Sequence, residues 1–290
     1  MIYMMNNCLA GIVTYNPEIE RLEESLNRIV PQVDNVVIID NGSKNISVIY
    51  DLLKKFPDVL IEANGENKGI ACALNQIGDK AEKLGKEFFM SLDQDSVVDE
   101  GMADKLLKLF EDEKVGGASP YINVDQDFVP KDKTEEFKTV ISSGFIVRTS
   151  VWKEIGGYWE YLFIDEVDHE FCFQLGRHGY KILRSYNTSL LHCIGETATK
   201  KVLGHTFTPT NHSAFRRYYI SRNNVIMGHL YPDEAEAFAH RNMMLFRIKL
   251  SILMCESDKF KKIRAIDRGI RDGRKWCKKN SAINERRISK

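Results

Sequence analysis

Short apolar runs alternate with helical patterns through the first half of the chain, and this alternation limits the possible folds more than any other feature. The apolar runs that predict strands lie at residues 8–13, 36–40, 59–61 and 88–92. The segments with helical periodicity lie at residues 18–30, 46–56 and 69–84. Strands alternating with helices are typical of a parallel sheet with right-handed crossovers. We therefore expect an α/β fold with a mostly parallel central sheet flanked by helices.

Polar residues follow three of these predicted strands. Thr14, Tyr15 and Asn16 follow the first strand, Asp40 ends the second, and the triplet Asp93-Gln94-Asp95 follows the fourth. Open α/β sheets bind ligands beyond the carboxyl ends of their strands, so this pattern predicts a nucleotide-binding edge. The sequence contains neither GxGxxG after the first strand nor GxxxxGK[ST], which argues against an ordinary NAD enzyme or a P-loop NTPase.

The triplet at residues 93–95 gives two carboxylates within one turn. Mg²⁺ and Mn²⁺ prefer oxygen ligands and commonly take one or two carboxylates together with phosphate oxygens. A nucleoside diphosphate leaves more readily when its charge is neutralised. Such triplets are also common in surface turns, but the position after an apolar strand favours a metal site at Asp93 and Asp95.

Four carboxylates occur within six positions at residues 165–170, among aromatic residues. One interpretation is that they stabilise the N-terminus of a helix. The other is that a carboxylate of this cluster, in which Asp168 and Glu170 stand where loop becomes helix, provides a general base in a partly desolvated setting. Four carboxylates exceed what a helix cap needs, so the sequence favours the functional interpretation.

Two further features keep both a structural and a functional interpretation. His192 ends a predicted strand and becomes a metal-ligand candidate only if the fold brings it back to Asp95. The glycine-bracketed segment 65–69 precedes a helix and is either a phosphate-binding turn or an ordinary strand-to-helix loop.

The second half of the chain has a looser pattern. We expect interrupted strand material at 137–147, a short helix and turn at 152–157, a helix at 168–178, strands at 181–183 and 189–192, and a loop at 195–211. Three helices should follow, at residues 213–228, 234–255 and 259–279. This gives a predicted domain of residues 1–212 and a basic helical extension of residues 213–290.

The chain of 290 residues has no net charge, but its charges are unevenly distributed. Residues 241–290 contain 16 Lys and Arg against 5 Asp and Glu, a net charge of +11, so residues 1–240 carry −11. A basic end favours a polyanionic partner, here an anionic membrane surface. Nucleic acid is not expected, because no recognised binding motif accompanies the charge. The other interpretations are a solvated helical hairpin and a homodimer contact.

The six scattered cysteines show no metal-ligand spacing and are expected to be free thiols in a reducing compartment. The sequence shows no signal peptide at its start and no long uninterrupted apolar stretch. We therefore expect a cytoplasmic protein that can lie peripherally on the inner face of the plasma membrane.

Taken in order, the motifs resemble those of family-2 inverting glycosyltransferases of the GT-A fold, especially bacterial rhamnosyltransferases. The resemblance runs from about residue 9 to residue 228. It rests on residues 13–17 (VTYNP), 39–43 (IDNGS), 67–71 (NKGIA) with Asn75, 92–96 (LDQDS), 162–171 (LFIDEVDHEF), 179–180 (GY), 191–195 (LHCIG) and 216–223 (RRYYISRN). Phe171 and Gln174 stand where rhamnosyltransferase-like sequences usually have Trp and Arg.

The resemblance implies a role for each matching residue. Asp168 matches the catalytic base, Asp95 the metal ligand, and His192 the residue that completes the metal shell. The metal would be Mg²⁺ or Mn²⁺. The residues implied to bind the nucleotide or substrate are Thr14, Tyr15, Asn16, Asp40, Asn67, Gly69, Asn75, Asp93, Glu170, Arg216 and Arg217, with Tyr219 beside the arginines.

The implied reaction is a single displacement with inversion, from a nucleotide-sugar donor to a hydroxyl of a saccharide or lipid-linked saccharide. The resemblance favours dTDP-rhamnose as the donor and bacterial cell-surface polysaccharide synthesis as the setting. The alternatives are a hexosyl- or galactofuranosyl-type transferase that uses a UDP-sugar, and a nucleotide-sugar-binding protein without transfer activity.

Overall fold

The computed structural model describes residues 7–123, 128–192, 200–202, 205–207 and 209–280. The chain divides into two compact units, of which the first comprises Met1–Glu160 and Val167–Cys193. The second comprises Tyr161–Glu166 and Ile194–Lys290. The short segment Tyr161–Glu166 thus belongs with the C-terminal part by its contacts, although the chain on both sides of it belongs to the first unit. The boundary predicted between residues 212 and 213 stays a prediction.

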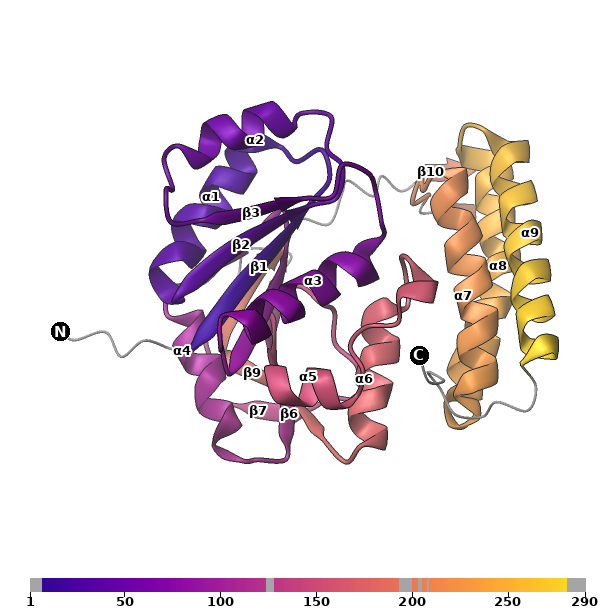
Figure 1. Cartoon of the computed structure of the whole chain (residues 1–290). Helices are drawn as coiled ribbons and strands as arrows, with labels where there is room; N and C mark the ends of the chain where they lie inside the picture. Colours follow the sequence, from indigo (N-terminus) through magenta and orange to yellow (C-terminus); the bar gives the residue numbers. More distant parts are fainter. Residues whose placement is uncertain (1–6, 124–127, 193–199, 203–204, 208, 281–290) are drawn as a thin grey trace. The chain divides into compact units, whose positions relative to one another are not determined.

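A nine-stranded sheet forms the framework of the first unit (Figure 1). The strand order is β3-β2-β1-β4-β8-β6-β9-β5, and β7 pairs with β9 outside this path. The strands are β1 Cys8–Thr14, β2 Asn35–Asp40, β3 Leu60–Ala63, β4 Phe88–Asp93, β5 Ser96–Val98, β6 Val115–Asn123, β7 Thr134–Glu136, β8 Phe145–Arg148 and β9 Lys181–His192.

The predicted α/β sheet is confirmed, and its two halves differ in strand direction. The four strands expected from the first half of the sequence, β1 to β4, pair in parallel. Beyond β4 the sheet is mixed, because β8 is antiparallel to both of its neighbours and β5 is antiparallel to β9. The strands that carry the polar residues therefore lie in the parallel half.

Helices cover both faces of this sheet. Ala10 and Ile12 of β1 belong to a core that includes Leu22 and Ile49 from the helices that follow β1 and β2. On the other face, Gly11 lies so close to Ile77 that a Cβ would be 2.4 Å from the Ile77 side chain. β1 is buried on both faces, which explains its continuous apolar sequence. The helices of this unit are α1 Ile19–Ile29, α2 Ile46–Leu53, α3 Ile70–Lys83, α4 Met102–Leu107, α5 Thr149–Glu154 and α6 Val167–Arg177.

Several elements differ from the sequence-based expectation. β6 was not expected, since its sequence contains two adjacent glycines and a proline. The two strands predicted at 181–183 and 189–192 form one strand, β9. Within the segment 195–211, predicted as a loop, β10 Lys200–Val202 and β11 His205–Phe207 form an antiparallel pair.

The second unit contains the three helices expected near the C-terminus, α7 Ala214–Leu230, α8 Ala235–Cys255 and α9 Lys259–Lys279 (Figure 1). α7 and α9 pack closely, because a Cβ on Gly269 would lie 2.4 Å from the Tyr218 carbonyl oxygen. The Ser221 hydroxyl donates across this contact to the Ile266 carbonyl at 3.1 Å. No helix in the described part of the chain is both long enough and apolar enough to span a membrane.

The cysteines whose placement is described are free thiols, namely Cys8, Cys72, Cys172, Cys255 and Cys277. Burial raises the pKa of the Cys8 and Cys172 thiols, so both stay protonated. Cys193 lies outside the described residues.

Candidate functional site

The carboxyl ends of β1, β2 and β4 meet at one edge of the sheet. In the parallel register Thr14 is the partner of Asp40, and Val13 is the partner of Asp93. The polar groups predicted from three separate strand ends are therefore neighbours. This edge is the place where open α/β sheets bind ligands.

Asp40 is buried and organises the turn that follows β2. One oxygen of its carboxylate accepts a hydrogen bond from the Thr14 hydroxyl at 2.9 Å. The other accepts from the backbone N–H groups of Gly42 and Ser43, at 3.1 and 2.9 Å. Both oxygens are thus used within the protein. The Asp40 carboxylate shapes the edge of the sheet and holds the ends of β1 and β2 together.

The residues after β1 interlock with this turn. The Asn16 N–H donates to the Ser43 hydroxyl at 2.8 Å, and the Asn16 carboxamide oxygen accepts from the Lys44 N–H at 2.8 Å. Tyr15 lies between these contacts and has 48% of its surface exposed. A solvent-facing aromatic ring at this edge can stack on a planar base.

Gln94 connects the end of β1 to the turn after β4. Its carboxamide oxygen accepts a hydrogen bond of 2.7 Å from the Tyr15 N–H. The Arg21 guanidinium donates to the carbonyl of Asp95 at 2.9 Å. The tight turn between β4 and β5 is therefore fixed from both sides, with the half-buried Asp93 and Asp95 at its ends.

Ser143 supports the same turn and was not identified from the sequence, where residues 142–144 looked only like an interruption in a strand. Its buried hydroxyl accepts from the Asp93 N–H at 3.1 Å and lies 2.7 Å from the Ser96 hydroxyl. The neighbouring Ser91 hydroxyl donates to the Ser142 carbonyl at 2.6 Å. The serine residues were the available sequence signal, but only the folded structure shows which hydroxyl bonds to the carboxylate turn.

The β-sheet register brings His192 to the carboxylate turn. β5 and β9 are antiparallel, and His192 is the partner of Ser96, the residue after Asp95. The His192 side chain lies outside the described residues, and no metal-binding group of three or more His, Cys, Asp and Glu occurs among the residues that are described. Two carboxylates on one tight turn are hard oxygen donors, so Asp93 and Asp95 fit a divalent cation.

The glycine-bracketed loop before α3 is held by asparagine side chains. The Asn67 carboxamide oxygen accepts from the Gly69 N–H at 2.9 Å, and the Asn41 oxygen accepts from the Lys68 N–H at 3.0 Å. Asn41 also donates to Asn67 at 3.2 Å. Two N–H groups of the loop are thus already bonded inside the protein, which supports the interpretation as a strand-to-helix loop at those positions.

Asn75 holds the segment before residue 161. Its carboxamide oxygen accepts from the Tyr158 N–H at 2.7 Å, and its nitrogen donates to the Tyr158 carbonyl and the Glu160 carboxylate, both at 2.9 Å. Gly157 lies against this carboxamide, where a Cβ would be 2.6 Å from the Asn75 oxygen. The geometry gives Asn75 a structural role at the end of this stretch of chain.

Asp168 lies in the first turn of α6 and is half-buried. One oxygen of its carboxylate accepts from the His169 N–H at 2.9 Å. Glu170 is buried, and its carboxylate accepts from the Gln174 carboxamide at 2.9 Å. The two carboxylates therefore differ in access, and Asp168 is the one that solvent can reach.

Aromatic packing anchors α6 to the strands of the site. Phe171 stacks on Tyr158 with ring centroids 4.2 Å apart and meets Phe145 edge-on at 6.4 Å. Phe145 is the β8 partner of Ser91, two residues before Asp93. Burial raises the pKa of the Tyr158 phenol, and the charge of Asp168 raises it further, so Asp168 lies near this aromatic cluster. The expected apolar surroundings are present.

Arg216 and Arg217 belong to the second unit. Arg216 forms an exposed ion pair with Asp165 at 3.0 Å. Arg217 is buried and donates to Glu256 at 2.9 Å, and Glu256 also accepts from Lys262 at 2.8 Å. A buried guanidinium paired with a buried carboxylate gives Arg217 a structural role in the packing of α7 and α9.

The model for glycosyl transferase family 2 matches residues 10–173. The dTDP-rhamnosyl transferase RfbF of Shigella flexneri is 31% identical over an alignment of 244 residues that covers 77% of this chain and 80% of that protein.

Two solved structures share the fold. The crystal structure of GalNAc-T7 with UDP, GalNAc and Mn²⁺ has a TM-score of 0.60 at 14% identity, over 77% of this chain. This chain spans about half of it, 48%. The crystal structure of residues 1–349 of S. aureus TarS has a TM-score of 0.51 at 15% identity, over 97% of this chain and 75% of that one.

Proposed function

Because the chain belongs to glycosyl transferase family 2, we propose that it transfers a rhamnosyl group from dTDP-rhamnose to a hydroxyl group of a saccharide acceptor. The family and the GT-A fold expected from the motifs are confirmed, and the chain is a glycosyltransferase. The observation that carries the rhamnosyl proposal is the 31% identity to a dTDP-rhamnosyl transferase over 244 residues. We assign the reaction to the synthesis of a cell-surface polysaccharide.

The edge formed by β1, β2 and β4 would bind the donor. The turn built by Thr14, Asn16 and Asp40 would border the nucleobase and ribose, with the exposed Tyr15 ring stacked on the base. Asn67 and Gly69 lie on the neighbouring loop and would border the sugar nucleotide. The hydrogen bonds that these residues make to one another support the proposal, because a prearranged edge loses little conformational entropy when the donor binds.

The carboxylate turn would hold a divalent cation. Asp95 and Asp93, with His192 opposite Ser96 in the register, would bind Mg²⁺ or Mn²⁺. When bound, the cation supplies positive charge beside the diphosphate of the donor. Gln94 and Ser143 would keep the two carboxylates in place through their hydrogen bonds to the turn.

Asp168 would act as the general base. It would remove the proton from the acceptor hydroxyl as the oxygen attacks the anomeric carbon. The bond from that carbon to the diphosphate oxygen would break in the same step, so that the nucleoside diphosphate leaves and the configuration inverts. Its position in the first turn of α6 and its partial exposure support this role. Glu170, buried on the Gln174 carboxamide, would stabilise the start of the helix.

A donor panel tests this proposal against the two alternatives. The purified chain is incubated with Mn²⁺, lipid-linked saccharides extracted from bacterial membranes, and dTDP-rhamnose, UDP-glucose or UDP-galactofuranose. Release of nucleoside diphosphate is measured. We expect the fastest release from dTDP-rhamnose, and Asp168→Asn should lower it by roughly 10²–10⁴-fold while donor affinity stays nearly unchanged.

Each other outcome of this panel favours a different conclusion. Faster release from a UDP-sugar would support the hexosyl- or galactofuranosyl-type alternative. Binding of dTDP-rhamnose without release would support a protein that only binds nucleotide sugars. Full turnover by Asp168→Asn would remove Asp168 from the role of base.

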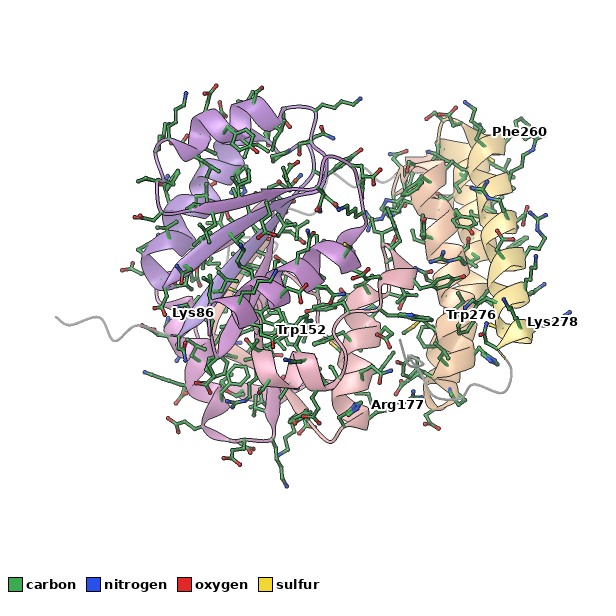
Figure 2. All side chains as sticks on the ribbon, in the orientation of Figure 1. Lys86, Trp152, Arg177, Phe260, Trp276 and Lys278 are labelled. Atoms are coloured by element: carbon green, nitrogen blue, oxygen red, sulfur yellow. The ribbon has the colours of Figure 1, made fainter. Side chains whose placement is uncertain are left out.

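The second unit would bring the enzyme to a lipid-linked acceptor at the inner face of the plasma membrane. Phe246, Leu250 and Leu253 are exposed and share one face of α8, because they are spaced by four and three residues. Phe260 projects from the start of α9, with 75% of its surface exposed (Figure 2). The exposed basic residues of α9 are Lys261, Arg264, Arg268, Arg271, Arg274, Lys275, Lys278 and Lys279. Apolar and basic groups together fit an anionic lipid surface, and a homodimer contact is the alternative use of the same face.

A further inference from the structure

The segment Tyr161–Glu166 has an unusual backbone. Phe163, Asp165 and Glu166 have φ angles of 66°, 63° and 64°, in the left-handed region that residues other than glycine seldom adopt. Such a backbone conformation is unfavourable for these residues and is tolerated only where surrounding contacts determine it. The residues directly after this segment are Val167 and Asp168.

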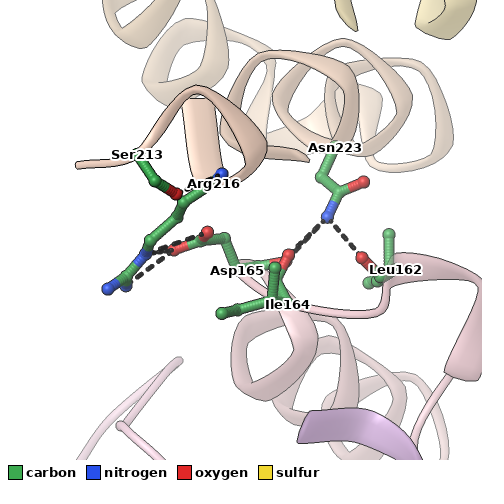
Figure 3. A network of polar contacts seen from close by, with 6 residues as sticks. All are labelled: Leu162, Ile164, Asp165, Ser213, Arg216 and Asn223. Carbon is green, nitrogen blue, oxygen red and sulfur yellow. Dashed lines mark hydrogen bonds and ion pairs between the residues drawn. The ribbon is translucent and has the colours of Figure 1, made fainter. Parts of the chain in front are cut away.

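Asn223 provides the central contact. Its side chain is fully buried, and its carboxamide nitrogen donates to the carbonyl oxygens of Leu162, Ile164 and Asp165 at 2.9, 2.8 and 2.9 Å. Figure 3 shows this side chain reaching from α7 to the carbonyl groups of the segment. Three carbonyl groups of this segment thus converge on one side-chain nitrogen.

Arg222 extends the contact to the start of the segment. Its guanidinium donates to the carbonyls of Tyr161 and Leu162 at 2.6 and 3.1 Å. It also donates to the Asn223 carboxamide oxygen at 2.9 Å, which orients the amide so that its nitrogen faces the segment. The guanidinium lies 4.6 Å from the ring centroids of both Tyr161 and Tyr219. Arg222 and Asn223 thus act as one clamp on four carbonyl groups.

Side-chain contacts hold the same segment at its surface. The Phe163 ring stacks on Tyr219 at 4.9 Å, and Arg216 forms its ion pair with Asp165 (Figure 3). Ordinary helix packing would account for the aromatic contact. It does not account for a buried arginine and a buried asparagine whose donors are directed at the backbone of one strained segment.

We propose that Arg222 and Asn223 are positioning residues for the reaction. By fixing residues 161–166, they determine where α6 begins, and so they set the position of the Asp168 carboxylate two residues further along the chain. The inference rests on the proposed role of Asp168 as base. A displacement of about 1 Å at a reacting group can reduce a rate on the order of 100-fold, so the clamp would affect catalysis more than donor binding.

The test compares Asn223→Asp and Arg222→Lys with a matched control. Asn223→Asp keeps the size of the side chain but removes the donors, and Arg222→Lys keeps the charge but removes the forked geometry. Ser221→Ala is the control, because Ser221 is buried on the same helix and bonds to Arg217, Tyr218 and Ile266, not to residues 161–166. Each variant is assayed with dTDP-rhamnose, well below its unfolding temperature.

We expect kcat to fall about 10- to 100-fold in Asn223→Asp and less in Arg222→Lys, with KM for the donor within about twofold of wild type. Ser221→Ala should keep the wild-type kcat even if it unfolds at a lower temperature. If Asn223→Asp does not fold, Arg222→Lys alone decides. A wild-type kcat in folded Asn223→Asp or Arg222→Lys would overturn the inference, and so would an equal loss of kcat in Ser221→Ala. Full turnover by Asp168→Asn would instead overturn the proposed role of Asp168 as the base.

Discussion

At the residue scale, several side chains of the candidate site act on the backbone rather than on a ligand. Asp40 bonds to Thr14 and to the turn after β2, and Asn75 bonds to Tyr158 and Glu160. Ser143 bonds to the turn that carries Asp93. Residues assigned to binding by a sequence motif can therefore serve by building the shape of the site. Tyr15, Asp93, Asp95 and Asp168 retain the exposure that contact with a substrate requires.

His212 allows a prediction of pH dependence at this scale. Burial, together with the positive charges of Arg216 and Arg217, lowers the pKa of His212 to about 4. The unfolded state binds the proton more readily, since the ordinary pKa is 6.5. The neutral form thus stabilises the fold above pH 6.5, and this stability is lost as the pH falls towards 4. His212→Gln should show a flatter loss of stability over that range in urea titrations. Parallel curves for both proteins would contradict the assignment.

At the element scale, burial explains which parts of the fold could be predicted. β1, β2 and β4 were predictable because they are buried on both faces and appear as continuous apolar runs. β6 was missed because Gly117 packs under the Phe145 ring, where a Cβ would lie 2.3 Å away, so the packing requires residues that look like a turn. β5 has only three residues, too few for a periodic pattern.

The same limit applies to the residues of the candidate site, which could be predicted only where they lie at the ends of predictable strands. Residues at the ends of predictable strands, such as Asp93 and Asp95, could be identified because the parallel order brings strand ends together. The contacts of Gln94 and Ser143 could not be predicted, because they depend on how β4 pairs with β1 and β8. The clamp of Arg222 and Asn223 needed the backbone conformation of residues 161–166, which no sequence pattern encodes.

Two glycines of the first unit should respond oppositely to alanine. Gly42 has a φ of 88°, and its Cβ would lie 2.7 Å from the Glu66 backbone, so Gly42→Ala should lower the free energy of unfolding by about 1–3 kcal/mol. Gly176 lies within α6 with nothing within 4 Å of its Cβ position, so Gly176→Ala should raise it by about 0.5–1 kcal/mol. Urea unfolding measures both changes. If Gly42→Ala leaves the free energy of unfolding unchanged, the turn after β2 can rearrange, which would contradict this prediction.

At the scale of the whole molecule, charge and exposed apolar surface are unevenly distributed. Residues 241–290 carry a net charge of +11 while residues 1–240 carry −11. The exposed face of α8 and the start of α9 add large apolar side chains to the basic part, with Phe246 at 74% and Phe260 at 75% exposure. Exposed apolar groups beside basic residues are typical of proteins that bind the surface of anionic membranes.

Vesicle co-sedimentation tests this surface. We expect binding to vesicles of phosphatidylcholine with phosphatidylglycerol, weaker binding at high salt, and little binding to phosphatidylcholine alone. Phe246→Asp with Phe260→Asp should abolish binding, whereas Val129→Asp, which changes an exposed valine of the first unit, should not. Equal binding by all variants would exclude the membrane role of this surface. A dimer that becomes a monomer only in the double variant, with unchanged vesicle binding, would assign the face to self-association.

The edge beyond β1, β2 and β4 is proposed to bind a nucleotide sugar through a cation on Asp93 and Asp95. Thermal unfolding with dTDP-rhamnose, with and without Mn²⁺, measures this most directly. Donor at about 100 times its Kd adds roughly 2.7 kcal/mol, which corresponds to a rise in Tm of about 5–10 °C. We predict that this rise in Tm occurs in the wild type only when Mn²⁺ is present. The Tm of Asp95→Asn should change little on addition of the donor. A Tm that no nucleotide sugar raises, or an equal rise in Asp95→Asn without Mn²⁺, would contradict the account.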